Sequence, residues 1–160
     1  MSRGMAEGDR LPIGQLLGRM QRHFRVTLYQ RAQNAGFSDI AESHLQVFGN
    51  IDWAGTRLTD LAARANMTRA SMAELVDELE RVGYLEREPD PSDGRAKLIR
   101  LTRKGKRVMT QALRVTREIE AEYIEAVGAQ RFESMARTLQ TLVDQRSAGT
   151  SAGQLRSRHV

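Results

Sequence analysis

The strongest chemical signal in the sequence is a run of cationic side chains without acidic neighbours. Between Gly94 and Arg107 there are seven Lys or Arg residues and no Asp or Glu, whereas residues 74–93 hold eight acids and two arginines. Cations at this density suit a polyanion such as the phosphate backbone of nucleic acid. The formal net charge of +5 agrees with this interpretation, but the local clustering is what carries it.

Two short helical patterns precede the basic run. Apolar residues recur at 58, 61, 62 and 65, and again at 72, 75, 76, 79 and 82, with a turn at 66–67 between the two patterns. This is the period of amphipathic helices, and a short helix, a turn and a second helix can place the second helix in a DNA major groove. The candidate contacts lie at the start of the second helix: Thr68, Arg69, Ala70 and Ser71, with Ala73 and Glu74 as further candidates.

The side chains in this turn have chemistry suited to either bases or phosphates. Arg69 can bind a guanine edge through two hydrogen bonds or bind a phosphate, and Ser71 can donate or accept a hydrogen bond. From this segment alone an ordinary helical hairpin is the alternative, in which Thr68 only caps the second helix and Arg69 is solvated.

A β-hairpin is predicted directly after the second helix. Residues 84–88 and 96–101 have strand character, and the tip between them, PDPSDGR, has the composition of a turn. Arg95 at such a tip suits a narrow, electronegative minor groove, and Asp93 is expected to hold its guanidinium. Lys97 and Arg87 would face phosphates. A solvated loop is the alternative, but it is less plausible because the hairpin directly follows the predicted reading helix.

Residues 58–105 resemble the winged helix-turn-helix of the MarR family of bacterial transcriptional regulators. The similarity lies in VDELERVGYLER at 76–87, DPSDGR at 90–95 and LTRKG at 101–105. It implies a mainly α fold with a small β-hairpin wing. It also implies a homodimer whose two winged-helix lobes bind a palindromic operator in double-stranded DNA. By this resemblance Thr68 to Met72 would meet the major groove, and Arg95, braced by Asp93, would enter the minor groove. Gly94 stands where many members have a second wing arginine, and Glu74 stands where many have a basic or small polar residue.

The domain organisation follows from the same patterns. Residues 1–9 are expected to be disordered, 10–146 to form a MarR-type domain, and 147–160 to form a flexible tail. Within the domain, 58–101 would be the winged helix-turn-helix, whereas 10–35 and 102–146 would mainly supply dimerisation helices. A further helix is predicted from Ser38 or Asp39 to about Asn50.

The predicted function is that of a DNA-binding regulator, most simply a repressor that occludes a promoter. Phosphate contacts from Arg87, Lys97 and Arg103 would set register, while Arg69 and Ser71 would recognise bases. The resemblance also implies a small amphipathic or aromatic effector. Each residue that could line its pocket also fits an ordinary core or surface role; these residues are Met20, His23, Phe24, His44, Phe48 and Trp53.

Several function classes are disfavoured by what the sequence lacks. It contains no cysteine, no GxSxG, P-loop or HExxH motif, and its three histidines lack metal-ligand spacing, so we expect no enzyme activity, metal or cofactor. Its apolar runs are too short for a transmembrane span and its N-terminus is not a signal peptide, which predicts a cytoplasmic protein without a membrane partner. The alternative function is a protein-interaction or assembly module that keeps this fold but has no operator.

Overall fold

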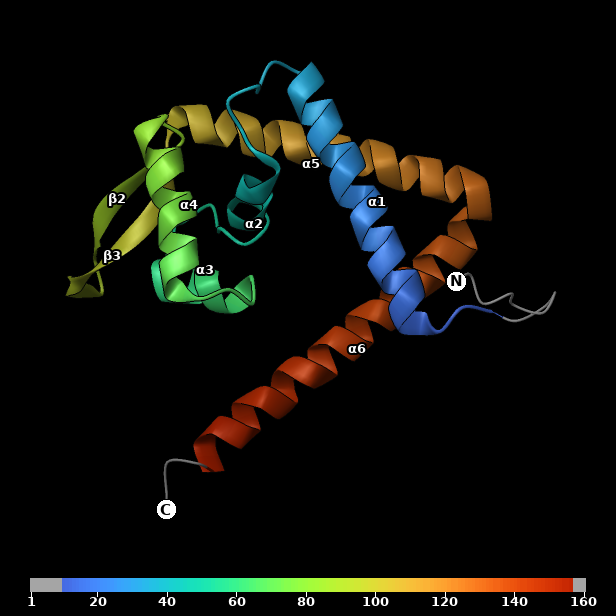
Figure 1. Ribbon diagram of the computed structural model, residues 1–160. Coiled ribbons are helices and arrows are strands. Elements are labelled where there is room, and N and C mark those ends of the chain that lie inside the picture. Colours follow the sequence, from blue (N-terminus) through green and yellow to red (C-terminus); the bar gives the residue numbers. More distant parts are fainter. Residues whose placement is uncertain (1–9, 157–160) are drawn as a thin grey trace, which may run out of the picture. The chain divides into compact units, whose positions relative to one another are not determined.

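The computed structural model describes the backbone of residues 10–156 and the side chains of residues 10–145 (Figure 1). Two compact units divide the chain, one ending at Thr116 and the other beginning at Arg117. The predicted disordered segment 1–9 lies outside the described residues. The elements in chain order are α1 Ile13–Asn34, η1 Glu42–His44, α2 Leu45–Phe48, β1 Thr56–Arg57, α3 Leu58–Arg64, α4 Arg69–Arg81, β2 Leu85–Asp90, β3 Asp93–Leu101, α5 Arg103–Val127 and α6 Ala129–Arg156.

Helix α4 has defined signals at both ends. At its start, Thr68 Oγ1 accepts a hydrogen bond from the Ser71 backbone N–H at 3.1 Å, which confirms the predicted N-cap. At its end, Gly83 adopts a φ of +80°, and the Tyr84 N–H bonds the Leu79 carbonyl at 2.8 Å. This is a Schellman motif, which stops the helix and turns the chain into β2.

The turn between α3 and α4 uses the same motif with an asparagine. Asn66 has a φ of +51°, and the following Met67 N–H bonds the Ala62 carbonyl at 2.9 Å. Asparagine tolerates this left-handed conformation better than most residues. The predicted turn at 66–67 is therefore confirmed, and it sets α3 and α4 as a helix-turn-helix pair.

The wing is part of a three-stranded antiparallel sheet in the order β1-β3-β2. Strand β1 pairs with β3, and Thr56 lies opposite Ile99. This strand was not predicted, because its two residues are too few to show an alternating pattern. Strands β2 and β3 are longer than predicted, so only Pro91 and Ser92 form the loop between them. A register irregularity at Pro89 and Asp90 precedes this loop.

One hydrophobic core holds the helix-turn-helix and the sheet together. Met72, Val76 and Leu79 form the fully buried face of α4, as the helical period predicted. This burial conflicts with the separate prediction that Met72 contacts DNA. The same core takes in the segment before β1, helix α3, the sheet and the start of α5. Its other buried members are Ile40, Val47, Phe48, Ile51, Leu61, Ala62, Tyr84, Leu85, Ile99, Leu101, Val108 and Met109.

The segment between α1 and β1 differs from the helix predicted from residue 38 to about residue 50. Only η1 and the four-residue α2 are helical there. The chain from 37 to 41 is held in another conformation because Gln33 Nε2 donates to the carbonyls of Phe37, at 3.2 Å, and Ile40, at 2.7 Å. Local sequence does not reveal this capture of two carbonyls by a glutamine of the preceding helix.

Asp39 lies in that segment and connects it to Tyr84 and Lys104, which follow α4 in the chain. Lys104 Nζ lies 2.8 Å from Asp39 Oδ2, and this hydrogen bond is the main cause of the lowered pKa of the Asp39 carboxyl. The Tyr84 hydroxyl donates to the other carboxylate oxygen of Asp39. The pKa of the Tyr84 hydroxyl is raised, mainly by burial. Lys104 also lies 3.9 Å from the centroid of the Tyr84 ring.

Helix α5 begins against the backbone at the end of α4. Thr102 Oγ1 lies 2.7 Å from the Gly83 carbonyl and accepts the Gly105 N–H at 3.1 Å. A Cβ at Gly105 would lie 2.1 Å from the Tyr84 carbonyl oxygen. Glycine is therefore required at 105 by the close approach of two backbone segments.

Helix α6 runs past the predicted end at residue 146 to Arg156. Residues 157–160 of the segment predicted to be a flexible tail lie outside the described residues.

Candidate nucleic-acid interface

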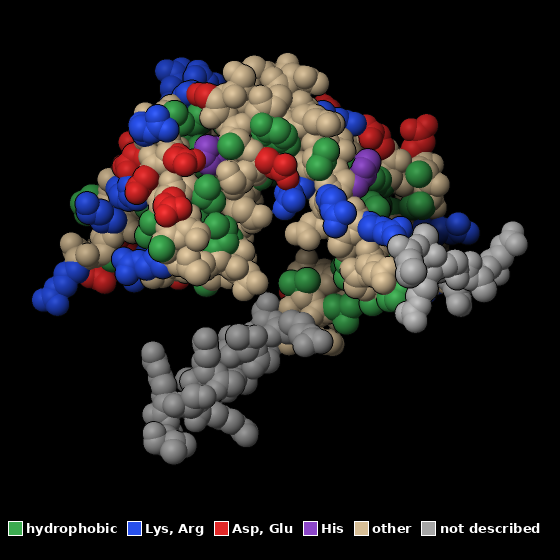
Figure 2. All heavy atoms as spheres, in the orientation of Figure 1, with side chains coloured by type: hydrophobic (Ala, Val, Ile, Leu, Met, Phe, Trp, Pro, Cys, Tyr) green, Lys and Arg blue, Asp and Glu red, His purple; other side chains and the backbone are tan. Residues whose placement is uncertain are grey.

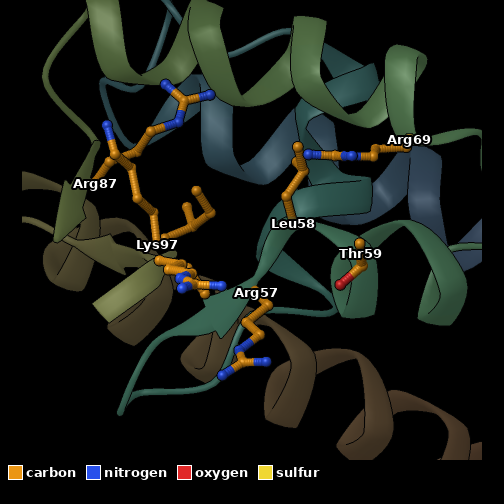
Figure 3. A pocket seen from close by; sticks show the side chains of 9 residues that line it. Arg57, Leu58, Thr59, Arg69, Arg87 and Lys97 are labelled. Atoms are coloured by element: carbon orange, nitrogen blue, oxygen red, sulfur yellow. The ribbon is translucent and has the colours of Figure 1, made fainter. Parts of the chain in front are cut away.

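A groove of about 460 Å³ lies between the first turn of α4 and the wing (Figure 3). Five of its nine lining residues are Lys or Arg, and none is acidic. The lining residues are Arg57, Leu58, Thr59, Arg69, Arg87, Arg95, Ala96, Lys97 and Ile99. The groove therefore presents cationic donors from β1, α4, β2 and β3 to one concave surface, which is a surface for an anion.

The first turn of α4 forms one side of the groove. The Thr68 hydroxyl is occupied, since it caps the helix and also donates to Ser71 Oγ at 2.9 Å. Arg69, Ala70 and Ser71 are exposed. Met72 is fully buried among the core residues, which corrects its predicted role as a DNA contact. The first turn of a helix contains positions on both faces, and the sequence prediction did not separate them.

The wing forms the other side of the groove, and its tip carries Arg95 and Lys97, both exposed. Asp93 was predicted to hold the Arg95 guanidinium. Its hydrogen bond instead goes to the backbone, because Asp93 Oδ1 accepts the Arg95 N–H at 3.1 Å. Asp93 thus shapes the turn at the tip and leaves the guanidinium of Arg95 exposed.

A buried anchor beside the turn at the wing tip was not among the predicted site residues. Asp90 is 6% exposed, and its Oδ2 lies 2.5 Å from Arg57 Nη2 and accepts the Arg57 Nε hydrogen bond at 2.7 Å. Its Oδ1 accepts hydrogen bonds from the Ser92 hydroxyl, at 2.7 Å, and the Ser92 N–H, at 2.8 Å. The Ser92 hydroxyl and N–H, followed by Arg57, lower the pKa of Asp90 to about 2. An Asp two residues before a Ser is a local Asx-turn signal, but only tertiary structure identifies Arg57 as the partner.

Arg87 lines the groove but does not offer a free cation. Its guanidinium pairs with two carboxylates of α4: Nη2 lies 2.5 Å from Asp77 Oδ1, and Nη1 contacts Glu80. The prediction that Arg87 contacts a phosphate is therefore corrected, because two internal carboxylates already satisfy its charge. These two ion pairs of Arg87 join β2 to the outer face of α4.

Arg103, a predicted phosphate contact, does not line the groove. The chain enters α5 beside the last turn of α4, where Lys104 Nζ donates to the Val82 carbonyl at 3.0 Å. The first turn of α4 is at the opposite end of a 13-residue helix, about 20 Å away at 1.5 Å per residue. The structure therefore separates Arg103 from Arg69.

Three cations of the groove have no acidic partner within the described part of the chain: Arg69, Arg95 and Lys97. Arg57 and Arg87 have internal partners and hold the scaffold. The groove thus combines two neutralised arginines that fix its shape with three cations that are available to a ligand.

A second, apolar hollow of about 450 Å³ is lined by α1, α2, the loop before β1, and α5. It contains Phe24, Phe48 and Trp53 of the predicted effector pocket. Met20 and His23 are not among its lining residues, which are Phe24, Leu28, Leu45, Phe48, Gly49, Ile51, Trp53, Met109, Ala112, Leu113 and Thr116.

His44 is a buried structural residue and does not line this hollow, contrary to its predicted role. Its Nδ1 accepts the Ala41 N–H at 3.0 Å, so Nε2 carries the proton that it directs toward Glu78 Oε2, 2.8 Å away. The Nε2 contact joins η1 to α4, whereas the Nδ1 contact holds the backbone at the start of η1.

Comparison with known proteins agrees with this geometry. The model of the MarR family matches residues 52–97, which span β1, the helix-turn-helix pair and most of the wing. The chain is therefore similar to the MarR family over this winged-helix segment. Solved structures similar to this chain include CouR from Rhodococcus jostii RHA1 bound to p-coumaroyl-CoA, with 27% identity, a TM-score of 0.67, and coverage of 82% of this chain and 92% of CouR.

Two other solved structures share the fold. Apo MarR from E. coli is 19% identical, with a TM-score of 0.68, and the match covers 84% of this chain and 98% of that one. The transcriptional regulator Tm0710 from Thermotoga maritima is 22% identical, with a TM-score of 0.58, and the match covers 89% and 99%. The similarity therefore extends beyond the winged helix to most of each chain.

Among residues 10–156, no helix has the length and apolar character needed to cross a membrane. In the same part of the chain, no group of three or more His, Asp or Glu residues is arranged to hold a metal ion.

Proposed function

We propose that this chain is a sequence-specific regulator of transcription that binds double-stranded DNA as a homodimeric repressor. The observation that carries the proposal is the groove between α4 and the wing, with Arg69, Arg95 and Lys97 exposed and without acidic partners among the described residues. Members of the MarR family are DNA-binding regulators, and the matched segment 52–97 contains most of this groove.

The groove suggests how the DNA would be contacted. The exposed first turn of α4 would enter the major groove, where Arg69 and Ser71 meet base edges. Arg95 at the wing tip would enter the adjacent minor groove, and Lys97 would bind a phosphate. Arg57 and Arg87 would act indirectly, because their internal ion pairs hold β1, α4 and the wing in place.

The proposal of a homodimer rests on apolar side chains that a single chain leaves exposed. In the first unit, Ile13, Leu17 and Met20 of α1 are 58%, 45% and 47% exposed. In the second unit, Met135 and Leu142 of α6 are 49% and 54% exposed. Large apolar side chains on these helices favour burial against another copy, and a two-fold dimer would match a palindromic operator with half-sites about 34–36 Å apart.

The apolar hollow supports a role for a small effector. CouR, which shares this fold, was crystallised with p-coumaroyl-CoA. Phe24, Phe48 and Trp53 give the hollow of this chain three aromatic side chains. We propose that it takes a small aromatic or amphipathic molecule. Binding would shift the population of DNA-competent dimers, provided that the ligand binds one conformation better than the other.

The direct test is selection of bound duplexes from a random library, followed by footprinting of the DNA that flanks the gene of this protein. We expect one enriched palindrome and its protection in that DNA. If the folded protein enriches no sequence and protects no palindrome, the protein-interaction module without an operator replaces this proposal. Size-exclusion chromatography with light scattering tests the dimer independently.

A further inference from the structure

A second cationic surface lies outside the groove, where α4 ends and α5 begins. Its members are the exposed side chains of Arg81, Arg103, Lys106 and Arg107, referred to below as the α5 basic surface. None of them has an acidic partner among the described residues. Lys104 is excluded because Asp39 neutralises it. In Figure 2 the blue side chains at the upper left gather at the end of the molecule where α5 starts in Figure 1.

The sequence around this surface is strongly one-sided in charge. From Gly94 to Arg117 there is no Asp or Glu. Only Arg95 and Lys97 of this stretch are cations that line the groove. The remaining positive charge therefore does not serve the groove, although the sequence shows a single continuous run.

The distance between the two surfaces is too large for them to act on one phosphate cluster. The α5 basic surface adjoins the last turn of α4, as the contacts of Lys104 with the Val82 carbonyl and of Thr102 with the Gly83 carbonyl show. The groove begins at the first turn, about 20 Å away along the helix. The Debye length is about 8 Å at physiological ionic strength, so charge at one end of α4 is largely screened from the other.

The spacing of the cations fits a nucleic-acid strand. Arg103 and Arg107 are one helical turn apart, about 6 Å along the axis. Phosphates advance by about 3.4 Å per nucleotide along each DNA strand, so the two guanidiniums can reach phosphates on adjacent or next-adjacent nucleotides. Arginine binds a phosphate through two parallel hydrogen bonds, which a diffuse anionic surface does not require.

We infer that the α5 basic surface binds the phosphate backbone of a second DNA segment while the groove holds the first. This inference rests on the proposed function, because it requires that the groove already holds one DNA segment. Contacts to phosphate alone carry no base recognition, so the second segment can have any sequence. The protein would then bring two stretches of DNA together, and a DNA already bound would raise the local concentration of its own flanking sequence.

The test is a capture assay with the full chain. Protein is bound to an immobilised duplex that carries the selected operator, and a labelled duplex of unrelated sequence is then added. We expect wild type to retain the labelled duplex and the variant Arg103→Gln/Lys106→Gln/Arg107→Gln to retain at least tenfold less. Affinity of that variant for the operator duplex in solution should change by less than about threefold, because the groove is intact.

The control is a variant with the same change in net charge at exposed positions in α1 and just before it, Arg10→Gln/Arg19→Gln/Arg22→Gln. It should capture the labelled duplex as wild type does, and size-exclusion chromatography establishes that this change in the proposed dimerisation segment leaves the oligomeric state unchanged. Circular dichroism melts of both variants establish that they are folded. A folded α5 variant that still captures the second duplex overturns the inference, because the second lobe of a dimer would then explain the capture.

Two further outcomes separate this inference from the proposed function. Operator binding without capture by wild type overturns the inference alone, whereas no binding of any duplex overturns the proposed function itself. Vesicles containing anionic phospholipid provide the other arm: binding to vesicles that is abolished in the α5 variant, with no capture of DNA, would assign the surface to a membrane and contradict the inference.

Discussion

Arg57 Nη2 lies 2.5 Å from Asp90 Oδ2, and this pair joins the strand before α3 to the tip-proximal end of β2. Asp90 is buried and also accepts two hydrogen bonds from Ser92, so a single carboxylate fixes the turn of the wing and ties it to β1. Arg57 is therefore not a free cation. The pair positions the wing relative to the helix-turn-helix without itself being offered to DNA.

The Asp90 carboxylate predicts a defined pH dependence of stability. Its pKa is lowered to about 2 from an ordinary value of 3.8, mainly by Ser92 and then by Arg57. A lowered folded-state pKa contributes stability that is fully present above pH 3.8 and is lost as the pH falls toward 2. The free energy of unfolding of wild type should therefore fall over this window more steeply than that of Asp90→Asn.

Urea unfolding at a series of pH values measures this difference. Asp144→Asn is the control, because its exposed carboxylate accepts a hydrogen bond from Gln140 on the same helix and should leave the wild-type slope unchanged. Parallel pH profiles for wild type and Asp90→Asn would show that the buried carboxylate does not contribute as described.

Substitution of Gly105 by alanine should destabilise the fold. Alanine is favoured over glycine inside a helix by up to about 1 kcal/mol, so an open position would become more stable. At 105 the new Cβ would lie 2.1 Å from the Tyr84 carbonyl oxygen, and overpacking of this kind costs about 1–3 kcal/mol or more. We expect a net loss of stability in urea unfolding.

The matched control for this substitution is Gly94→Ala. No atom lies within 4 Å of a Cβ at Gly94, so the free energy of unfolding should change by less than about 0.5 kcal/mol. Equal stabilities of the two variants would mean that α5 does not press against Tyr84 as the structure shows.

The open surroundings of Gly94 also permit a gain of function. Many MarR-family members have an arginine at this position, and its φ is not in the left-handed region that favours glycine. Gly94→Arg should bind DNA more tightly, with a slope of log affinity against log salt that is steeper by about 0.9 for one additional phosphate neutralised per lobe. Gly94→Gln controls for side-chain size, and it should leave the slope unchanged in a fluorescence anisotropy titration.

Met72 separates the core from the DNA-facing side of α4. Its side chain is fully buried, so Met72→Ala should lower the free energy of unfolding by about 2–5 kcal/mol. Ser71→Ala, on the exposed side, should change stability by less than about 0.5 kcal/mol. If the Met72→Ala protein had wild-type stability but bound DNA more weakly, the result would support the DNA contact predicted from the sequence and contradict the core role of Met72.

The sequence predicted those parts of the molecule whose signals are local. The cap at Thr68, the turn at Asn66 and Met67 and the stop at Gly83 are each set by one or two residues and their nearest neighbours, and the structure confirms them. The burial of Val76 and Leu79 follows from helical period alone.

The errors involve contacts between residues far apart in the chain. Arg87 was predicted to contact DNA because its partners, Asp77 and Glu80, lie on a helix that sequence cannot place beside β2. Arg103 was predicted to contact a phosphate together with Lys97, but β3 carries the chain back to the opposite end of α4, and Arg103 does not line the groove. Proximity in sequence was mistaken for proximity in space.

The most direct test of the central claim is the salt dependence of operator binding by Arg95→Ala/Lys97→Ala. Its two altered side chains are exposed cations of the groove in wild type, so the folded variant should bind more weakly. Its slope of log affinity against log salt should be shallower by about 0.9 for each phosphate per lobe that the variant no longer neutralises. Arg19→Ala/Arg22→Ala on α1 should match wild type. Wild-type affinity and slope in the folded wing variant would contradict the assignment of this groove to DNA.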